Sequence, residues 1–167
     1  MTRSLVPYTF WPSALFAGYP VLFPQGVETF QAFVPRENAK EIFTQLLCYS
    51  RQQDCLPLWA VIKQHRRDSF LLSYQVDGFS LELNYARSHP AALKLQQVLQ
   101  TMIAVVIEAG GRFYLAKDHF LTPAQYRQSI GAEAFETFLR FKGACDPEQR
   151  LQSDLYRRLF ILDSQPF

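Results

Sequence analysis

The clearest periodic pattern in this chain lies between Phe79 and Tyr85. Every second residue is apolar there, and the residues between them are Ser80, Glu82 and Asn84. A period of two is typical of a β-strand with one buried face and one face in water. Three further segments predict strands by their alternation and their β-branched and aromatic content. They are residues 27–34, 58–64 and 112–115.

Apolar residues at helical spacing predict two long helices between these strands. The first spans residues 38–53, and Asn38 with Glu41 three residues later predicts its N-cap. The second begins after His89-Pro90, and Gly110-Gly111 ends it in the manner of a left-handed C-cap. The resulting order β-α-β-β-α-β predicts an α+β fold, the split βαβ (ferredoxin-like) antiparallel sheet covered by helices.

The last third of the chain predicts a helical C-terminal appendage. Thr122-Pro123 suits the cap and first position of one helix, and Ser153 can cap another. We therefore expect three parts: a lead-in rich in aromatic residues and proline at 1–25, a sheet domain at 26–118, and a helical segment at 119–167.

Composition and charge exclude some classes of function. The chain has 167 residues and a formal net charge of +2, which is too mild to indicate a nucleic-acid-binding protein. Its longest apolar run, Met102–Ile107, is much shorter than the roughly 20 residues of a membrane-spanning helix. We expect a protein that does not span a membrane.

The three cysteines, Cys48, Cys55 and Cys145, lack the spacing of a zinc site. Their odd number, and the absence of a signal peptide pattern, favour free buried thiols and a cytoplasmic protein. His65, His89 and His119 fall in separate predicted turns, which argues against a shared metal site.

Sequence motifs for common chemistries are missing. There is no Gly-rich phosphate loop, and Gly110-Gly111 follows a helix instead of a strand. Lys117 is the candidate that remains. It follows a short strand beside Tyr114, where a held ammonium group could stabilise an anion. The alternative is an ordinary surface lysine paired with Asp118.

Two ordered segments carry a resemblance to a known family. The first is Gly110-Gly111-Arg112-Phe113-Tyr114-Leu115-Ala116-Lys117-Asp118, and the second runs from Asp146-Pro147 to Arg157-Arg158-Leu159. Together they resemble the C-terminal end of FAD-dependent oxidoreductases of the vanillyl-alcohol-oxidase type. The likeness is to oxidases of decaprenylphosphoryl-ribose and of related sugars and aldonolactones. It is strongest over residues 110–160 and weaker upstream, to about residue 8.

The resemblance implies roles for individual residues. Tyr114, Ala116, Lys117 and Asp118 match the family's Tyr-x-Ala-Lys-Asp, whose lysine contacts flavin and substrate. This implies that Lys117 is catalytic and binds the cofactor, with Tyr114 facing flavin or substrate. The upstream likeness implies that Lys63, Ser80 and Glu82 also bind substrate. Glu82 stands where those enzymes have a cysteine, which changes the charge of the pocket and leaves the substrate open.

The resemblance also implies a cofactor and a partner. FAD would be held mainly by a separate FAD-binding domain or FAD-domain chain, for which these residues leave no room. The substrate would be a small sugar, a polyol or a sugar-lipid, oxidised at a hydroxyl by hydride transfer to flavin. We expect this chain to be inactive alone.

Two alternatives stay open. The first is a stand-alone ligand- or protein-binding module without redox activity. The second is a peripheral membrane protein that meets lipid-linked sugars through the aromatic residues between Tyr8 and Phe23.

Overall fold

The structure, a computed structural model, describes residues 19–87 and 92–161. One four-stranded antiparallel sheet has the order β2-β3-β1-β4. Its strands are β1 (Val27–Pro35), β2 (Trp59–His65), β3 (Gly78–Ala86) and β4 (Arg112–Phe113). The helices are α2 (Tyr19–Leu22), α3 (Arg36–Gln52), α4 (Ala92–Glu108), α5 (Pro123–Ile130), α6 (Ala132–Cys145) and α7 (Asp154–Phe160).

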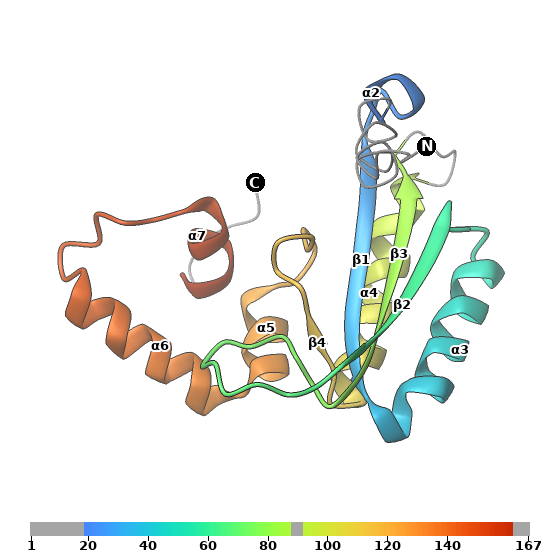
Figure 1. Cartoon of the computed structure of the whole chain (residues 1–167). Coiled ribbons are helices and arrows are strands. Elements are labelled where there is room, and N and C mark those ends of the chain that lie inside the picture. Colours follow the sequence, from blue (N-terminus) through green and yellow to red (C-terminus); the bar gives the residue numbers. More distant parts are fainter. Residues whose placement is uncertain (1–18, 88–91, 162–167) are drawn as a thin grey trace, which may run out of the picture.

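This topology confirms the α+β prediction. Helices α3 and α4 follow β1 and β3 and pack on one face of the sheet, as in a split βαβ unit (Figure 1). Most of the predicted lead-in at residues 1–25 lies outside the described residues, as does the predicted helix start at His89-Pro90.

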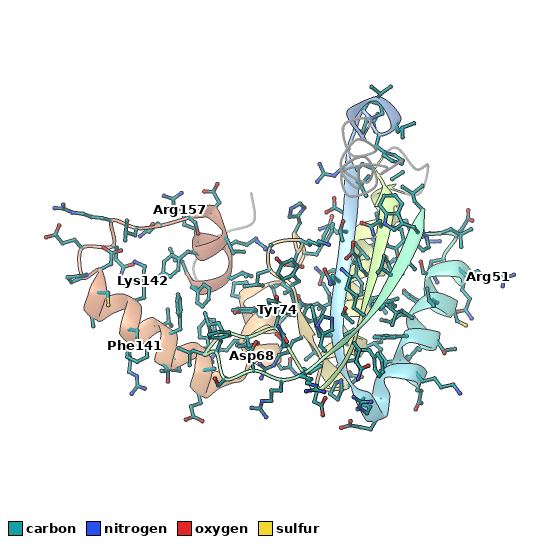
Figure 2. The ribbon with its side chains drawn as sticks, viewed as in Figure 1. Arg51, Asp68, Tyr74, Phe141, Lys142 and Arg157 are labelled. Atoms are coloured by element: carbon teal, nitrogen blue, oxygen red, sulfur yellow. The ribbon has the colours of Figure 1, made fainter. Side chains whose placement is uncertain are left out.

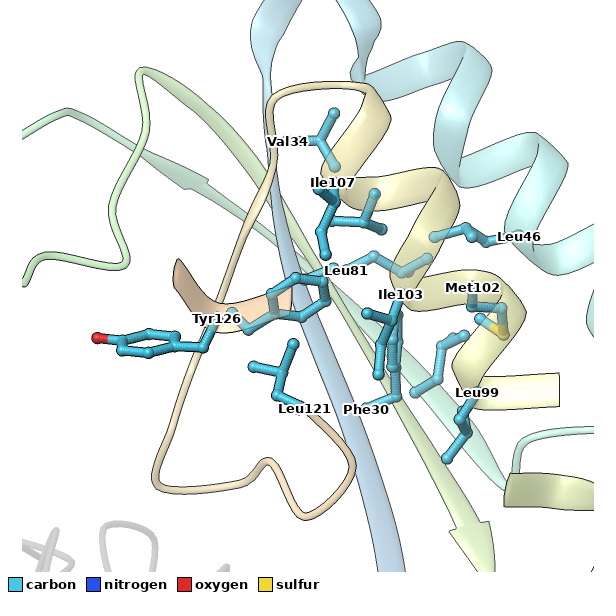
Figure 3. Close-up of a cluster of buried hydrophobic side chains, with 14 of the residues drawn as sticks. Phe30, Val34, Leu46, Leu81, Leu99, Met102, Ile103, Ile107, Leu121 and Tyr126 are labelled. Atoms are coloured by element: carbon cyan, nitrogen blue, oxygen red, sulfur yellow. The ribbon is translucent and has the colours of Figure 1, made fainter. Parts of the chain in front are cut away.

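The hydrophobic core lies between this sheet face and the two helices. Phe30 and Leu81 of the sheet meet Leu99, Met102 and Ile103 of α4, all nearly or fully buried (Figure 3). Apolar burial of this kind is the main favourable contribution to folding. The helical periodicity of α4 is explained by this single buried stripe.

The C-terminal helices extend the core beyond the β4 edge of the sheet (Figure 1). Tyr126 of α5 packs edge-on against Phe160 of α7, with ring centroids 5.5 Å apart. Thr122 caps α5 with a full capping box, and Ser153 caps α7 by accepting from the amide of Tyr156. Both predicted caps are confirmed.

The Gly110-Gly111 helix end is also confirmed. α4 ends at Glu108, and Gly110 has φ +74°. The amides of Gly110 and Gly111 donate to the carbonyls of Ile107 and Val106. This is the paired bonding of a left-handed helix cap, and it turns the chain directly into β4.

Three sequence predictions were wrong. Helix α3 starts at Arg36, after Pro35, and the side chain of Asn38 donates to the carbonyl of Ala109 instead of capping the helix. The last strand contains only Arg112–Phe113, not four residues. The thiols are free but only Cys55 is buried, whereas Cys48 and Cys145 are exposed.

The main correction concerns β3. Its polar residues Ser80, Glu82 and Asn84 were expected to face water, yet they are 0%, 8% and 3% exposed. Polar groups become buried at a cost unless they find partners. A buried polar row on the face opposite the core is therefore the strongest structural pointer to function.

Gly78 starts β3 at a point of close backbone approach. A Cβ placed there would lie 2.2 Å from the carbonyl oxygen of Val34 and 2.8 Å from the nitrogen of Arg36. Val34 belongs to the β1–β3 ladder, and the amide of Arg36 donates to the carbonyl of Asp77, so neither atom can move without disturbing backbone hydrogen bonds. We expect Gly78→Ala to lower the free energy of unfolding by about 2 kcal/mol or more, measured by urea denaturation.

Gly143 provides the matched control. It lies in α6, and a methyl group added at its Cα would have no other atom within 4 Å. Gly143→Ala should stabilise the protein by up to about 1 kcal/mol, because alanine favours a helix interior. Equal effects of the two substitutions would show that Gly78 is not sterically required.

Candidate functional site

The candidate site is the sheet face that α3 and α4 do not cover, called here the polar face. Directly paired residues of antiparallel strands share a face, so the register fixes its members. They are Thr29, Gln31 and Phe33 of β1, then Trp59, Val61, Lys63 and His65 of β2, then Ser80, Glu82 and Asn84 of β3. Arg112 of β4, which pairs with Phe33, also lies on it, and residues that follow β4 complete it, above all Tyr114 and Lys117.

Glu82 lies at the centre of the polar face and contacts two lysines, Lys117 and Lys63. Lys117 Nζ donates to Glu82 Oε2 at 2.8 Å, and Lys63 Nζ lies 3.7 Å from the same oxygen. Asn84 Nδ2 donates to the other oxygen, Oε1, at 3.2 Å. The side chain of Glu82 is 11% exposed, against 35% for Lys117 and 53% for Lys63. The largely buried carboxylate of Glu82 thus pairs with two lysines whose side chains reach solvent.

The ionisation of Glu82 follows from these contacts. Burial acts to raise its pKa, but the hydrogen bonds from Lys117 and Asn84 and the charges of Lys117 and Lys63 outweigh burial. The pKa of Glu82 therefore lies below its ordinary value, and the group is ionised at neutral pH. With two ammonium groups and one carboxylate, the cluster carries a net positive charge.

Gln31 is the unusual member of the polar face. It pairs directly with Glu82 across the β1–β3 ladder and is 8% exposed. Its Oε1 is buried and finds no hydrogen-bond donor among the described residues. An unpaired buried acceptor costs free energy, so such a group in a native protein requires an explanation. A bound ligand that donates a hydrogen bond would provide one.

An aromatic row lies beside this cluster. The ring of Tyr74 packs 4.9 Å from Phe33 and 4.8 Å from Tyr114, centroid to centroid. Tyr74 belongs to the connection between β2 and β3 and lies between the sheet and the C-terminal helices (Figure 2). His65 packs on the other side of Phe33, at 4.8 Å. The row gives the polar face an aromatic border of rings that pack edge-on or tilted against one another.

The structure brings most of the predicted site residues together. Lys117, Lys63 and Glu82 form one ion-pair cluster, and Tyr114 borders it through the aromatic row. Ser80 is different, because it is fully buried and its hydroxyl is hydrogen-bonded to Nε2 of His65 at 2.9 Å. That these residues contact flavin or substrate stays a prediction.

The alternative pairing of Lys117 with Asp118 does not occur. Asp118 binds Arg158 of α7 at 3.0 Å and accepts from the amides of Phe120 and Leu121. Arg158 also donates to the carbonyls of Asp118 and Leu121. Asp118 and the Arg-Arg helix of the motif therefore have a structural role: they fix the turn that carries Lys117.

Asp146 has a similar structural role. Its carboxylate accepts from Lys142 and from the amides of Arg150 and Leu151. The hydrogen bond from Lys142 is the main cause of its lowered pKa. The Asp146-Pro147 segment thus closes α6 and orders the turn before α7.

Sequence reasoning missed Gln31, His65, Tyr74 and Asn84. A signal existed for Gln31, which lies two residues from Phe33 on a predicted strand, whereas His65 was predicted to lie in the turn after the strand at 58–64. Alternation puts such residues on one face. Their meeting with Glu82 required the strand register, which local pattern does not give.

Two kinds of feature are absent from residues 19–87 and 92–161. No group of three His, Cys, Asp or Glu side chains in these ranges is placed to hold a metal ion. No helix in this part of the chain is long and apolar enough to cross a membrane.

Acid should weaken the Glu82 cluster. Because the folded pKa of Glu82 lies below its usual value near 4.5, its ion pairs stabilise the fold above that pH and are lost as pH falls through the folded pKa. We expect the free energy of unfolding to lose on the order of 1 kcal/mol from this source below about pH 4.5. Urea denaturation across acidic pH would measure it.

Glu82→Gln should remove that part of the acid dependence and lower stability at neutral pH. Glu136→Gln is the matched control, since Glu136 also pairs with a cation, Arg127, but is 54% exposed. If the free energy of unfolding of Glu82→Gln falls with acidic pH as steeply as that of the unaltered chain, the lysines do not hold Glu82 ionised.

Comparison with models of known protein families found no match to this chain, and comparison with curated proteins found none either. The polar face and the motifs that resemble flavin-dependent oxidases are therefore the grounds for any statement of function.

Proposed function

We propose that this chain is the C-terminal substrate-domain portion of an FAD-dependent oxidoreductase that oxidises a hydroxyl of a sugar, polyol or sugar-lipid. The observation that carries the proposal is the position of Lys117. Its ammonium group lies on the sheet face opposite the core, in one cluster with Lys63 and Glu82. These are three of the residues that the family resemblance selects independently by sequence.

The polar face has groups that suit a flavin ring edge, which combines hydrogen-bond donors and acceptors. Lys117 uses one N–H on Glu82 and keeps others for a carbonyl oxygen of a ligand. Gln31 Oε1 is a buried acceptor that lacks a donor among the described residues. A cation with unused donors beside an unpaired acceptor supports the fit of a flavin ring edge to the polar face.

When bound, the flavin would supply the ring that takes up hydride from the substrate. Lys117 would hold positive charge against the ring edge that becomes more negative. A preorganised charge in a partly dry site is worth more than one in water, since no solvent has to reorient during reaction. Glu82 keeps Lys117 in place through the hydrogen bond to its ammonium group.

The same cluster supports a polyhydroxylated substrate. Carboxylate and amide oxygens accept from hydroxyl groups, and ammonium groups donate to them. Glu82 and Lys63 offer both kinds of contact, with Tyr114 as an aromatic wall. We propose that the substrate is bound by Glu82, Lys63, Ser80 and Tyr114. Separately, the free thiols favour a cytoplasmic protein.

The experiment is co-expression with an FAD-binding segment encoded next to this chain. The purified pair should carry FAD and show a flavin spectrum, whereas this chain alone should bind FAD weakly or not at all. Tight FAD binding by the isolated chain would contradict the proposal that another polypeptide segment holds the cofactor. A pair that forms without flavin would contradict the assignment as an oxidase.

The second candidate is a stand-alone ligand- or protein-binding module without redox activity. One observation favours it: Lys117 is already committed to Glu82, which is how a purely structural ion pair would look. The absence of any neighbouring reading frame with an FAD-binding domain would favour the module. A flavin-containing pair that oxidises polyols would exclude it.

A further inference from the structure

A second feature lies outside the polar-face cluster, where β4 meets α5. A cavity of about 100 Å³ is lined there by Arg112 and Tyr114 on one side and by Tyr126 and Ser129 on the other. Tyr74 and Tyr114 of the aromatic row also line it, so the cavity adjoins the polar face. This volume is room for a few waters or one small group.

Tyr126 brings an unpaired hydroxyl to this cavity. The residue is 3% exposed, and its ring packs against Phe135 and Phe160 of the core. Figure 3 shows the hydroxyl pointing away from the hydrophobic cluster. The oxygen is buried and has no hydrogen-bond partner among the described residues. A buried hydroxyl without a partner is costly, so it calls for a group in the cavity.

Arg112 brings a cation to the same place. Its Nη1 donates to the carbonyl oxygen of Ser73 at 2.6 Å, and no acidic group of the described residues lies within ion-pairing distance of it. Burial, and after it the charge of Arg67, lowers the pKa of Arg112, whereas Tyr126 and then Asp68 act in the opposite direction. The guanidinium nevertheless stays charged. The surroundings are thus positive overall, which favours a bound anion.

Tyr126 is suited to donate a hydrogen bond there. Burial raises its pKa to about 12, with the charge of Arg112 acting in the opposite direction. The hydroxyl therefore keeps its proton at neutral pH. A protonated hydroxyl and a guanidinium fork are both donors, and together they match the acceptor oxygens of an anion.

We propose that this cavity binds a small oxyanion, a phosphate or carboxylate group, between the Arg112 guanidinium and the Tyr126 hydroxyl. A pocket of this size suits a small oxyanion, which is either a free anion or the terminal group of a larger molecule that extends outward past Tyr114. This site does not depend on flavin binding at Lys117.

The test is titration of the 167-residue chain with inorganic phosphate, followed by calorimetry and by the thermal unfolding midpoint. Sodium chloride at equal ionic strength is the reference. Acetate and ribose 5-phosphate, used in parallel, distinguish a carboxylate from a phosphate and a free anion from an attached one. We expect saturable binding of at least one of these oxyanions, with a midpoint increase that chloride does not reproduce.

Tyr126→Phe should weaken that binding at least about tenfold, because a hydrogen bond to a charged group is lost. The substitution removes a hydroxyl that has no partner among the described residues and should leave the fold intact. Arg112→Gln should abolish binding. Tyr156→Phe, in which a more exposed tyrosine of α7 loses its hydroxyl, should bind as the unaltered chain does.

If every oxyanion changes the unfolding midpoint no more than chloride does, the proposal is overturned and the cavity holds water only. Binding that Tyr126→Phe does not weaken would overturn it too, since the anion would then be elsewhere. Neither result would bear on the oxidase proposal, which concerns FAD and Lys117.

Discussion

Replacing Lys117 by methionine should reduce kcat of the FAD-containing complex by about 10²–10³-fold. Methionine keeps the length of the side chain and removes its charge, so the ring edge would lose its nearest cation. Glu82 would keep its contacts with Asn84 and Lys63, which limits the structural damage. Steady-state kinetics with a polyol substrate would measure the effect, and circular dichroism would confirm folding.

Lys40→Met provides the control, because Lys40 is an exposed lysine of α3, on the other side of the sheet. It should leave kcat unchanged. An increase in KM without a fall in kcat in Lys117→Met would assign Lys117 to substrate binding only. If kcat and KM are both unchanged in Lys117→Met, Lys117 is not part of the active site.

Asp118→Ala should lower the free energy of unfolding by about 3–4 kcal/mol. The side chain of Asp118 is 10% exposed and binds Arg158 and the amides of Phe120 and Leu121. Its loss would leave the Arg158 guanidinium, 29% exposed, without its carboxylate. The turn that carries Lys117 and the docking of α7 should weaken together.

Urea denaturation would measure this loss, with Asp154→Ala as the control. Asp154 also pairs with an arginine of α7, but its side chain is fully exposed, so its removal should have a much smaller effect. Similar small losses for both substitutions would show that Asp118 is not the anchor of α7.

The fold was largely predictable from local pattern. Alternation in β3, the Gly110-Gly111 helix end and the caps at Thr122 and Ser153 are all short-range signals, and each matches the structure. Asn38 misled the prediction because Pro35, at the end of β1, already allows the helix to start at Arg36. The side-chain amide of Asn38 donates to the carbonyl of Ala109, which is distant in sequence.

The candidate site was predictable only in part. Lys117, Lys63 and Glu82 were selected by resemblance. The β2–β3 register places Lys63 and Glu82 on one face, and the turn after β4 brings Lys117 to Glu82. Local pattern could not show that Ser80, Glu82 and Asn84 would be buried. That outcome depends on the β2–β3 connection and on residues after β4, which lie far away in sequence.

Arg112 shows the same limit. In the sequence it is one residue of a short strand, and nothing local indicates a cavity. Its approach to Tyr126 follows from the packing of α5 on β4, which a pattern of apolar positions does not specify.

The central claim is that the Lys117 ammonium group lies against a flavin held by another polypeptide segment. The most direct measurement is the flavin midpoint potential of the co-purified complex, compared between the unaltered chain, Lys117→Met and Lys40→Met. A cation at the ring edge favours the reduced, more negative form. Losing it should lower the potential by about 30 mV or more, since 30 mV corresponds to about 1.4 kcal/mol for two electrons. A potential that is the same in all three complexes would contradict the claim.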